Sequence, residues 1–345
     1  MFGHDPLIDR RLKTHRTILL LPKMLWLLAR TWLLFLLCVH SAAHAGDADK
    51  VLSAIAVSPH VYYFQGDAGM ASTSNQGFMS NAGFVVTKDG VVVFDSLGTP
   101  TLGNAMIAAI RKITALPIKR VIVSHYHADH IYGLQAFHAI GAEIWAHRNG
   151  QRYLDSDIAV ARLAERRVSL FPWVDDKTHV LAADKWLDFP TNKIIRFTMG
   201  DVRFQLIDVS GAHSDEDIMM FVENDSVLFA GDLYFTGRIP FVGNANSRVW
   251  LTALDHMLEV KPRIVIPGHG AKSTKPLDDL KLTKDYLTYL RKVMGAAVSD
   301  MTGFEDAYAK VDWGAFAGYP AFAQANRLNA YGTYILMEQE SLEKK

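Results

Sequence analysis

Residues 124–133 read SHYHADHIYG, which places three histidines and one aspartate within six positions. The apolar run VIV directly precedes this stretch and suits a buried strand. In a loop that leaves a strand, His125 and His127 can converge on one ion. Asp129 and His130, past the turn, can face a second point close by. Zinc takes imidazole nitrogen and carboxylate oxygen in sets of about four. One stretch cannot complete two such sites, so we expect further ligands elsewhere in the chain.

Three further ligand candidates each lie beside glycine where an apolar strand is expected to end. They are His213 in GAHS, Asp232 in AGD and His269 in PGHG. Glycine lets the backbone turn tightly and approach an ion closely. An acidic side chain directly after an apolar strand is costly to bury alone, so Asp232 indicates a nearby cation.

The bulk composition is that of an ordinary globular protein. The chain has 345 residues, of which 50% are hydrophobic and 21% charged, enough for a sizeable core in one large or two small domains. The formal net charge is zero, so composition offers no electrostatic argument for nucleic acid as a partner.

The N-terminal residues 1–45 have the layout of a secretory signal peptide. Basic residues precede an apolar core at 25–39, and Ala43 and Ala45 fit an A-x-A cleavage site. We therefore expect export to the periplasm and no stable membrane span after cleavage, with a single membrane anchor as the alternative. The start at Met1 or Met24, and the export route, stay open. The only cysteine, Cys38, lies within this segment, so the mature protein has no thiolate ligand.

Strands and helices are expected to alternate along the mature chain. We expect strands at 83–86 with 91–94, 121–123, 142–146, 193–197 with 202–209, 218–222 with 227–230, and 263–266. We expect helices at 101–114, from 133, within 148–175, and at 248–260, 277–294 and about 320–342. Both halves contain hairpins, a helix and a short apolar strand that enters a histidine-bearing loop. This organisation predicts two similar α/β layers packed face to face.

The set HYHADH, GAHS, AGD and PGHG, in that order, resembles the metallo-β-lactamase superfamily over about residues 60–275. The resemblance implies an α/β fold, a four-layer αββα sandwich with a dinuclear centre in a cleft at one edge. We therefore expect a metallo-β-lactamase-like domain at 46–275 and a C-terminal helical extension at 276–345 that packs on it.

The resemblance also implies a role for each matching residue. The first metal would be held by His125, His127 and His213. The second would be held by Asp129, His130 and His269, with Asp232 bridging both ions. Asp95, at the end of its strand, would orient the histidine-rich loop through hydrogen bonds.

Two details indicate a branch of the superfamily. Asp232 stands where some family β-lactamases have cysteine, which is the pattern of glyoxalase II-like and broad hydrolase branches. Residues 81–98, with 318–320 and 326–331, resemble the exported quinoprotein relay system zinc metallohydrolases, near sulfur-oxidation accessory proteins. That branch implies a periplasmic quinoprotein dehydrogenase as a partner.

We therefore predict an exported dinuclear zinc hydrolase, with iron or manganese as alternative metals. A metal-bridging hydroxide would attack a small-molecule ester, thioester, lactone or amide. Asp129 would shuttle the proton, and Tyr234 and Arg238 are candidate substrate contacts. The alternatives are a β-lactamase, a mononuclear iron enzyme of sulfur oxidation similar to persulfide dioxygenases, and a non-hydrolytic accessory protein of a quinoprotein system. His147 is a candidate for support of the site, whereas Tyr126 and Tyr132 are expected to pack.

Overall fold

The computed structural model describes residues 52–343. The expected signal peptide at 1–45 lies outside the described residues. Within residues 52–343, no helix combines the length and the apolar character that crossing a bilayer requires.

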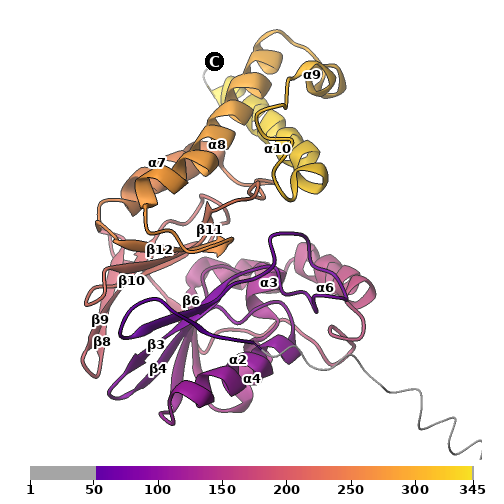
Figure 1. The fold of residues 1–345 in the computed structure, drawn as a ribbon. Helices are drawn as coiled ribbons and strands as arrows, with labels where there is room; N and C mark the ends of the chain where they lie inside the picture. The colour runs from indigo at the N-terminus through magenta and orange to yellow at the C-terminus, as the bar shows by residue number, and fades with distance from the viewer. Residues whose placement is uncertain (1–51, 344–345) are drawn as a thin grey trace, which may run out of the picture. The chain divides into compact units, whose positions relative to one another are not determined.

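Two β-sheets form the centre of the protein (Figure 1). The first sheet has seven strands in chain order: β1 (Ile55–Ala56), β2 (Val61–Phe64), β3 (Ala82–Thr87), β4 (Gly90–Phe94), β5 (Ile118–Ile122), β6 (Glu143–His147) and β7 (Lys185–Leu187). The second has five strands in the order β12 (Ile264–His269), β11 (Val227–Phe235), β10 (Ile218–Val222), β9 (Val202–Asp208) and β8 (Ile194–Met199). The expected strand pairs are confirmed as hairpins β3–β4, β8–β9 and β10–β11.

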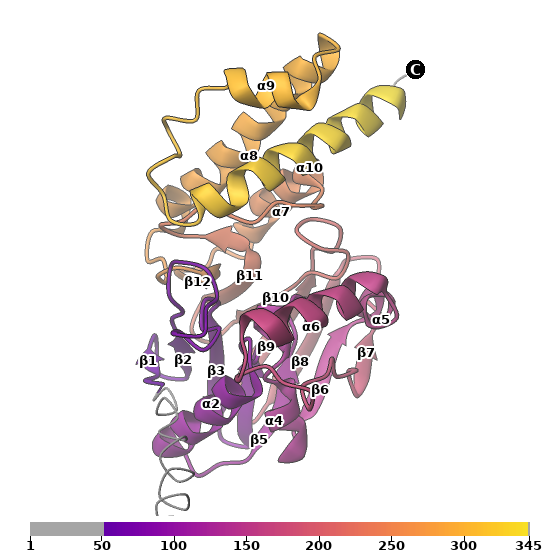
Figure 2. The ribbon, with the colours of Figure 1, turned by 90° about the vertical axis from the view of Figure 1, so that its right-hand side faces the viewer.

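Helices cover the outer face of each sheet, which completes the αββα sandwich expected from the sequence. One side carries α2 (Pro100–Ile113), α3 (Ala128–Ile131), α4 (Leu134–Ala139), a 3₁₀ turn η1 (Arg148–Gly150), α5 (Gln151–Leu154) and α6 (Asp157–Ser169). The other side carries α7 (Ser247–Met257), α8 (Pro276–Ser299), α9 (Phe304–Lys310) and α10 (Phe322–Glu343). Figures 1 and 2 show the two helical layers on opposite sides of the paired sheets.

Three apolar clusters hold these four layers together. The central cluster joins the inner faces of both sheets and includes Val92, Phe94 and Phe229. A second packs α2 and α4 on the first sheet, and a third packs α7, α8 and α10 on the second. The alternation of inward and outward side chains along each strand supplies one apolar face for each contact.

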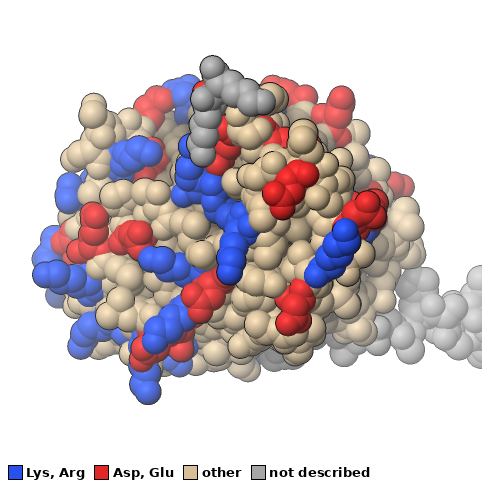
Figure 3. Space-filling model, turned by 90° about the horizontal axis from the view of Figure 1, so that it is seen from above, with Lys and Arg blue, Asp and Glu red and all other residues tan. Residues whose placement is uncertain are grey.

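The C-terminal helices pack on the outer face of the second sheet. Tyr286 of α8 is fully buried there, and its hydroxyl donates to Asn326 of α10 at 2.8 Å. Helix α9 is a short element that the sequence pattern did not predict. On the face seen in Figure 3, which carries these helices, basic and acidic side chains are interspersed.

Two pairs of parallel strands position the site. Strand β4 runs parallel to β5, and β11 runs parallel to β12, so the carboxyl ends of each pair meet at one sheet edge. The strand expected at 227–230 continues to Phe235 through a register irregularity at Gly231, where φ is +53°. Asp232 therefore lies within β11 rather than after it. The irregularity at Gly231 is a β-bulge, which changes the direction of the Asp232 side chain while β11 continues to pair with β12.

Candidate metal centre

The first group of ligand atoms comes from four residues on three separate segments. One nitrogen or oxygen each from His125, His127, His213 and Asp232 all lie within 4.8 Å of one another. His213 Nε2 is 3.1 Å from His127 Nδ1 and 3.5 Å from Asp232 Oδ2. The loop after β5 supplies two of these histidines, and the loop after β9 supplies His213.

The second group lies beside the first and contains Asp129, His130 and His269, again within 4.8 Å of one another. His269 Nε2 is 3.3 Å from Asp129 Oδ2. The carboxylate of Asp232 reaches both groups. Its Oδ2 lies 3.5 Å from His213 Nε2 of the first group and 3.2 Å from His269 Nε2 of the second, and its Oδ1 lies 3.2 Å from His130 Nε2 of the second. The structure thus brings all seven expected ligand residues together and places Asp232 between the two sets.

This cluster fits metal ions. Within residues 52–343, the Nε2 atoms of His125, His130 and His269 are buried and have no hydrogen-bond partner, and the same holds for Asp232 Oδ1. Buried polar atoms are normally paired, and an unpaired one costs about 1–3 kcal/mol. One bound cation in each ligand group would satisfy these atoms. The donor set is imidazole nitrogen and carboxylate oxygen only, which suits zinc, iron or manganese.

The electrostatics of the cluster also call for positive charge. Burial lowers the pKa of His213 to about 3, so this imidazole is neutral and ready to ligate. Burial also disfavours a proton on His130, yet the carboxylates of Asp129 and Asp232 raise its pKa well above the usual value. Burial lowers the pKa of His269, but Asp232 and Asp129 together raise it above its usual value. A proton on each of these two rings supplies the positive charge that a bound metal ion would otherwise supply to the buried carboxylates.

Asp95 makes contacts that orient the histidine-rich loop. Its Oδ1 accepts from the Ser124 amide at 2.7 Å, and its Oδ2 accepts from the Ser124 hydroxyl at 2.8 Å. The same Oδ2 lies 2.9 Å from His130 Nδ1, which leaves Nε2 for a metal. Asp95 has φ +61°, an unusual backbone conformation for aspartate, which turns its carboxylate toward the loop.

Two acidic residues that hold the ligand-bearing loops in place were not predicted from the sequence. Asp217 accepts hydrogen bonds from the amides of His213 and Ser214, both at 2.8 Å. Glu216 is buried and its Oε1 accepts from the Tyr126 amide at 3.0 Å, between His125 and His127. The run DED at residues 215–217, directly after GAHS, was the sequence feature that could have indicated them. Three acidic side chains just before a strand need hydrogen-bond donors or positive charges nearby.

Gly268 lies so close to the Asp232 carboxylate that no side chain fits at this position. A β-carbon at Gly268 would lie 1.9 Å from Asp232 Oδ1 and 2.7 Å from the backbone carbon of Gly231. Both distances are far below contact, so only glycine fits there. Nearby, Asn81 donates to the carbonyls of Pro267 and Gly270, both at 2.8 Å, and ties β12 to the start of β3.

Tyr234 and Arg238, the two candidate substrate contacts, are both buried but contact different parts of the protein. Tyr234 is fully buried under α8, where its hydroxyl donates to Pro276 O at 3.2 Å, so that expectation is wrong: the strand pleat turns it into the core. Arg238 is also fully buried, and its Nη1 lies 3.2 Å from His269 Nδ1 and 3.2 Å from Gly69 O. Its Nε and Nη2 have no hydrogen-bond partner among the described residues.

His147 lies outside the cluster. It is mostly buried, its ring stacks on Phe189, and its Nε2 is 3.6 Å from Asp208 Oδ1. Tyr126 packs in the core as expected, with its ring on Trp186.

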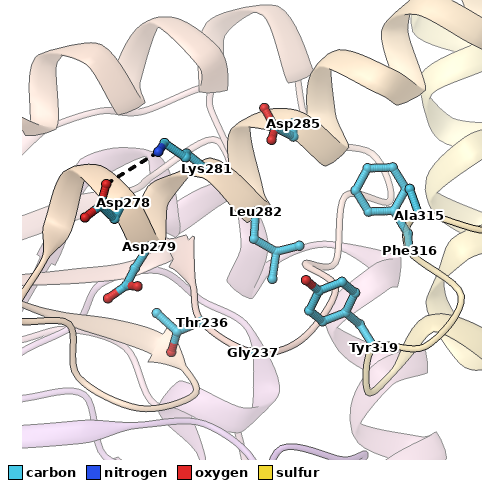
Figure 4. A pocket seen from close by; sticks show the side chains of 10 residues that line it. All are labelled: Thr236, Gly237, Asp278, Asp279, Lys281, Leu282, Asp285, Ala315, Phe316 and Tyr319. Atoms are coloured by element: carbon cyan, nitrogen blue, oxygen red, sulfur yellow. Dashed lines mark hydrogen bonds and ion pairs between the residues drawn. The ribbon is translucent and has the colours of Figure 1, made fainter.

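A cavity of about 520 Å³ lies between the loop after β11, the first turns of α8 and the loop before α10 (Figure 4). Carboxylates and aromatic rings line it, among them Asp279, Asp285, Phe316 and Tyr319. None of the seven ligand residues contributes to its wall, so we assign it no part in metal chemistry.

Comparison with known families identifies the class. The family model described as the metallo-beta-lactamase superfamily matches residues 75–269, more than half of the chain. The chain therefore belongs to the metallo-β-lactamase superfamily, a result that agrees with the fold and with the order of the motifs. This superfamily contains metal-dependent hydrolases, and the cluster described above could bind metal.

Individual relatives are distant. A type 2 metallo-β-lactamase of Bacillus sp. (strain 170) is 25% identical over 220 residues, which cover 62% of this chain and 72% of the relative. A linear primary-alkylsulfatase of Pseudomonas sp. (strain ATCC 19151) is 20% identical over 239 residues, or 59% of this chain and 44% of the relative.

Solved structures are also similar to this chain in fold, at low sequence identity. The sec-alkylsulfatase Pisa1 of Pseudomonas sp. matches with a TM-score of 0.64 and 16% identity, over 82% of this chain and 50% of that one. The metallo-β-lactamase FIM-1 of Pseudomonas aeruginosa, in a mono-zinc form, matches with a TM-score of 0.56 and 18% identity, over 71% and 98%. The chain spans about half the length of the alkylsulfatases that it matches.

Proposed function

We propose that this protein is a metal-dependent hydrolase that holds two ions, with zinc as the preferred metal. The observation that carries the proposal is the position of Asp232, whose carboxylate lies 3.5 Å from His213 Nε2 of the first group and 3.2 Å from the Nε2 atoms of His130 and His269 in the second. His125, His127 and His213 would hold one ion, and Asp129, His130 and His269 the other. An all-nitrogen and oxygen donor set of this size fits two zinc ions.

The bound ions would supply Lewis acidity and lower the pKa of a water molecule. The side chains of the protein would orient the metal ligands and the water molecule. Burial raises the pKa of Asp129, but His130 and His269 together hold it well below its usual value, so its carboxylate stays ionised and can accept a hydrogen bond from a water molecule. Asp95 holds the ring of His130 in one tautomer through its 2.9 Å contact. Arg238 places positive charge behind His269.

We propose an ester, thioester, lactone or amide as the substrate bond. Sulfate-ester cleavage is the second candidate, and the alkylsulfatase match supports it because that match covers more of this chain than the β-lactamase match. β-Lactam hydrolysis is the third candidate, supported by the Bacillus relative.

We also propose that the mature protein works in the periplasm after cleavage near residue 45, beside a quinoprotein dehydrogenase. The basic and apolar pattern of residues 1–45 supports this proposal. N-terminal sequencing of protein from a periplasmic fraction tests it. An intact N-terminus in the membrane fraction would contradict it.

Metal analysis and a substrate screen test the hydrolase. Purified protein should contain two zinc ions per chain and hydrolyse at least one member of a panel of esters, thioesters, lactones, alkyl sulfates and nitrocefin. The control His127→Ala should lose that activity. One iron and no zinc per chain would favour the sulfur-oxidation enzyme instead. Full metal content without turnover of any compound would favour the accessory protein.

A further inference from the structure

The loop between β2 and β3, residues 65–81, ends against the second group of ligand residues. Residues 76–81 are all buried, whereas residues 67–75 are all at least partly exposed. Met79, Ser80 and Asn81 directly precede β3 and are each 3% exposed or less. Figure 2 shows this loop beside β12, the strand that ends at His269. The buried end of the loop therefore lies where it can contact ligand residues directly.

The ring of His269 is held by the backbone of Met79. His269 Nδ1 lies 2.8 Å from Met79 O. A carbonyl oxygen can only accept a hydrogen bond, so Nδ1 carries the hydrogen and donates it. The other ring nitrogen, Nε2, then presents its lone pair toward the carboxylates of Asp129 and Asp232, at 3.3 and 3.2 Å. Met79 thus fixes the tautomer that a metal ligand needs.

Asn81 holds the backbone on both sides of His269. Its Nδ2 donates to Pro267 O and Gly270 O, both at 2.8 Å, and its backbone amide donates to Gly268 O at 2.7 Å. Glycine restrains its own backbone less than any other residue does, and His269 lies between two glycines. The hydrogen bonds from Asn81 therefore supply a restraint that the local sequence lacks.

Ser80 contacts a second member of the same ligand group. Its hydroxyl donates to the backbone oxygen of Asp129 at 2.5 Å. Residues 79–81 thus contact His269 and Asp129, two of the three residues of this group. The third, His130, is held by Asp95 through the 2.9 Å contact described above.

The first ligand group is held by other residues. Asp217 accepts from the His213 amide at 2.8 Å, and Glu216 accepts from the Tyr126 amide at 3.0 Å. Among the residues that the structure describes, no hydrogen bond joins residues 79–81 to a histidine of the first group. A change in residues 79–81 should therefore act on one ligand group and spare the other.

We propose that Asn81 is a positioning residue for the second metal ion, supported by Ser80 and by the carbonyl of Met79. Asn81 acts through His269, because its three hydrogen bonds fix the backbone that carries this ligand. Partners that orient metal ligands in this way typically change the metal affinity by about 10- to 100-fold. This inference rests on the proposed two-ion centre and assigns the support of its second ion.

Zinc titration of the metal-free protein tests the inference without catalysis. Asn81→Ala should weaken the second ion by about 10- to 100-fold and leave the affinity for the first ion unchanged. Ser80→Ala, which keeps Asn81 in place, should weaken the second ion severalfold and provides the test if Asn81→Ala does not fold. Unchanged affinity for both ions in the two variants would overturn the inference.

The matched control is Asn326→Ala in α10. Asn326 is an asparagine that is 1% exposed, and its amide contacts the hydroxyl groups of Tyr286 and Tyr308 at 2.8 and 3.0 Å. Asn326→Ala should lower the stability in urea unfolding, as Asn81→Ala does, but should bind two zinc ions with the affinity of the wild type. Equal loss of zinc in both variants would overturn the inference, since general destabilisation would then explain it.

A double variant identifies the ion that Asn81 supports. His213→Ala removes a ligand of the first group, so the ion that remains should lie in the second group. Asn81→Ala/His213→Ala should therefore bind no ion with high affinity, although each single variant keeps one. One ion retained in the double variant would overturn the inference. A wild type with one ion, lost in Asn81→Ala and kept in Asn326→Ala, would refute the two-ion centre and keep the role of Asn81. A wild type that binds no zinc would overturn both.

Discussion

Asp95 and His130 form a buried pair in which Oδ2 of the carboxylate lies 2.9 Å from Nδ1 of the ring. The pair joins the end of β4 to α3, because Asp95 follows the strand and His130 belongs to the short helix. It leaves Nε2 of His130 facing Asp232 at 3.2 Å. A carboxylate in this position sets the tautomer and direction of a ligand histidine and raises its basicity.

Asp95→Asn should lower the affinity for the second metal ion by about 10- to 100-fold, because the neutral amide holds His130 less firmly. Chelator competition followed by metal analysis measures this loss. The matched control is Asp225→Asn, which changes a second buried carboxylate that contacts a histidine, the partly exposed His60 at 3.0 Å, at the opposite end of β11 from Asp232. Loss of metal in both variants alike would mean that general destabilisation, and not the orientation of His130, is responsible.

His213→Ala should reduce the metal content from two ions per chain toward one. The variant removes a neutral buried ligand of the first group and leaves the second group complete. Metal analysis after gel filtration gives the stoichiometry. His147→Ala is the control, since His147 is a mostly buried histidine whose contacts are Asp208 and Phe189. Two ions retained in His213→Ala would remove His213 from the ligand set.

Gly268→Ala should abolish high-affinity metal binding and also lower the stability of the fold, because its β-carbon would lie 2.7 Å from the backbone carbon of Gly231. Its new methyl group would meet Asp232 Oδ1 at 1.9 Å and so displace the carboxylate between the two groups. Isothermal titration of the metal-free protein with zinc measures the change, which we expect to exceed about tenfold. Gly303→Ala, where a β-carbon meets nothing within 4 Å, should bind as the wild type does. Unchanged zinc affinity in Gly268→Ala would refute the bridging role of Asp232.

Glu216→Gln should make stability less sensitive to pH. Burial raises the pKa of Glu216 to about 7 from 4.5, so the folded state binds this proton more tightly than the unfolded state. Its contribution to stability is fully present below pH 4.5 and is lost as the pH rises through 7. Urea unfolding of metal-free protein should therefore show the variant gaining on the wild type by about 1–3 kcal/mol between pH 4.5 and 8. A constant difference would contradict this account.

Local sequence patterns predicted much of the fold. The Asp-Gly turn between two β-branched runs predicted the β3–β4 hairpin, and Thr99 followed by proline explains why α2 begins where it does, since its hydroxyl accepts from the Leu102 amide. The helical stretch expected within 148–175 is divided in the structure. Ser156 starts a new helix by capping it, so α5 and α6 are separate.

Side-chain direction near the site could not be predicted in the same way. Tyr234 and Arg238 both follow Asp232 closely, yet one contacts Pro276 in the core and the other contacts His269. The irregularity at Gly231 shifts the register of β11, and a shift of one residue reverses the face of every side chain after it. Sequence spacing alone does not reveal such a shift.

The sequence by itself determined the superfamily, the order of the two layers and the identity of the seven candidate ligands, because short motifs and strand periodicity are local properties. Only the tertiary structure decided that Asp232 lies between both histidine groups and that Asp95 contacts His130. Those relationships join residues that are about 30 to 145 positions apart in the chain, as from His125 to His269. They arise from the packing of two sheets and the parallel pairing of β11 with β12, which no local pattern encodes.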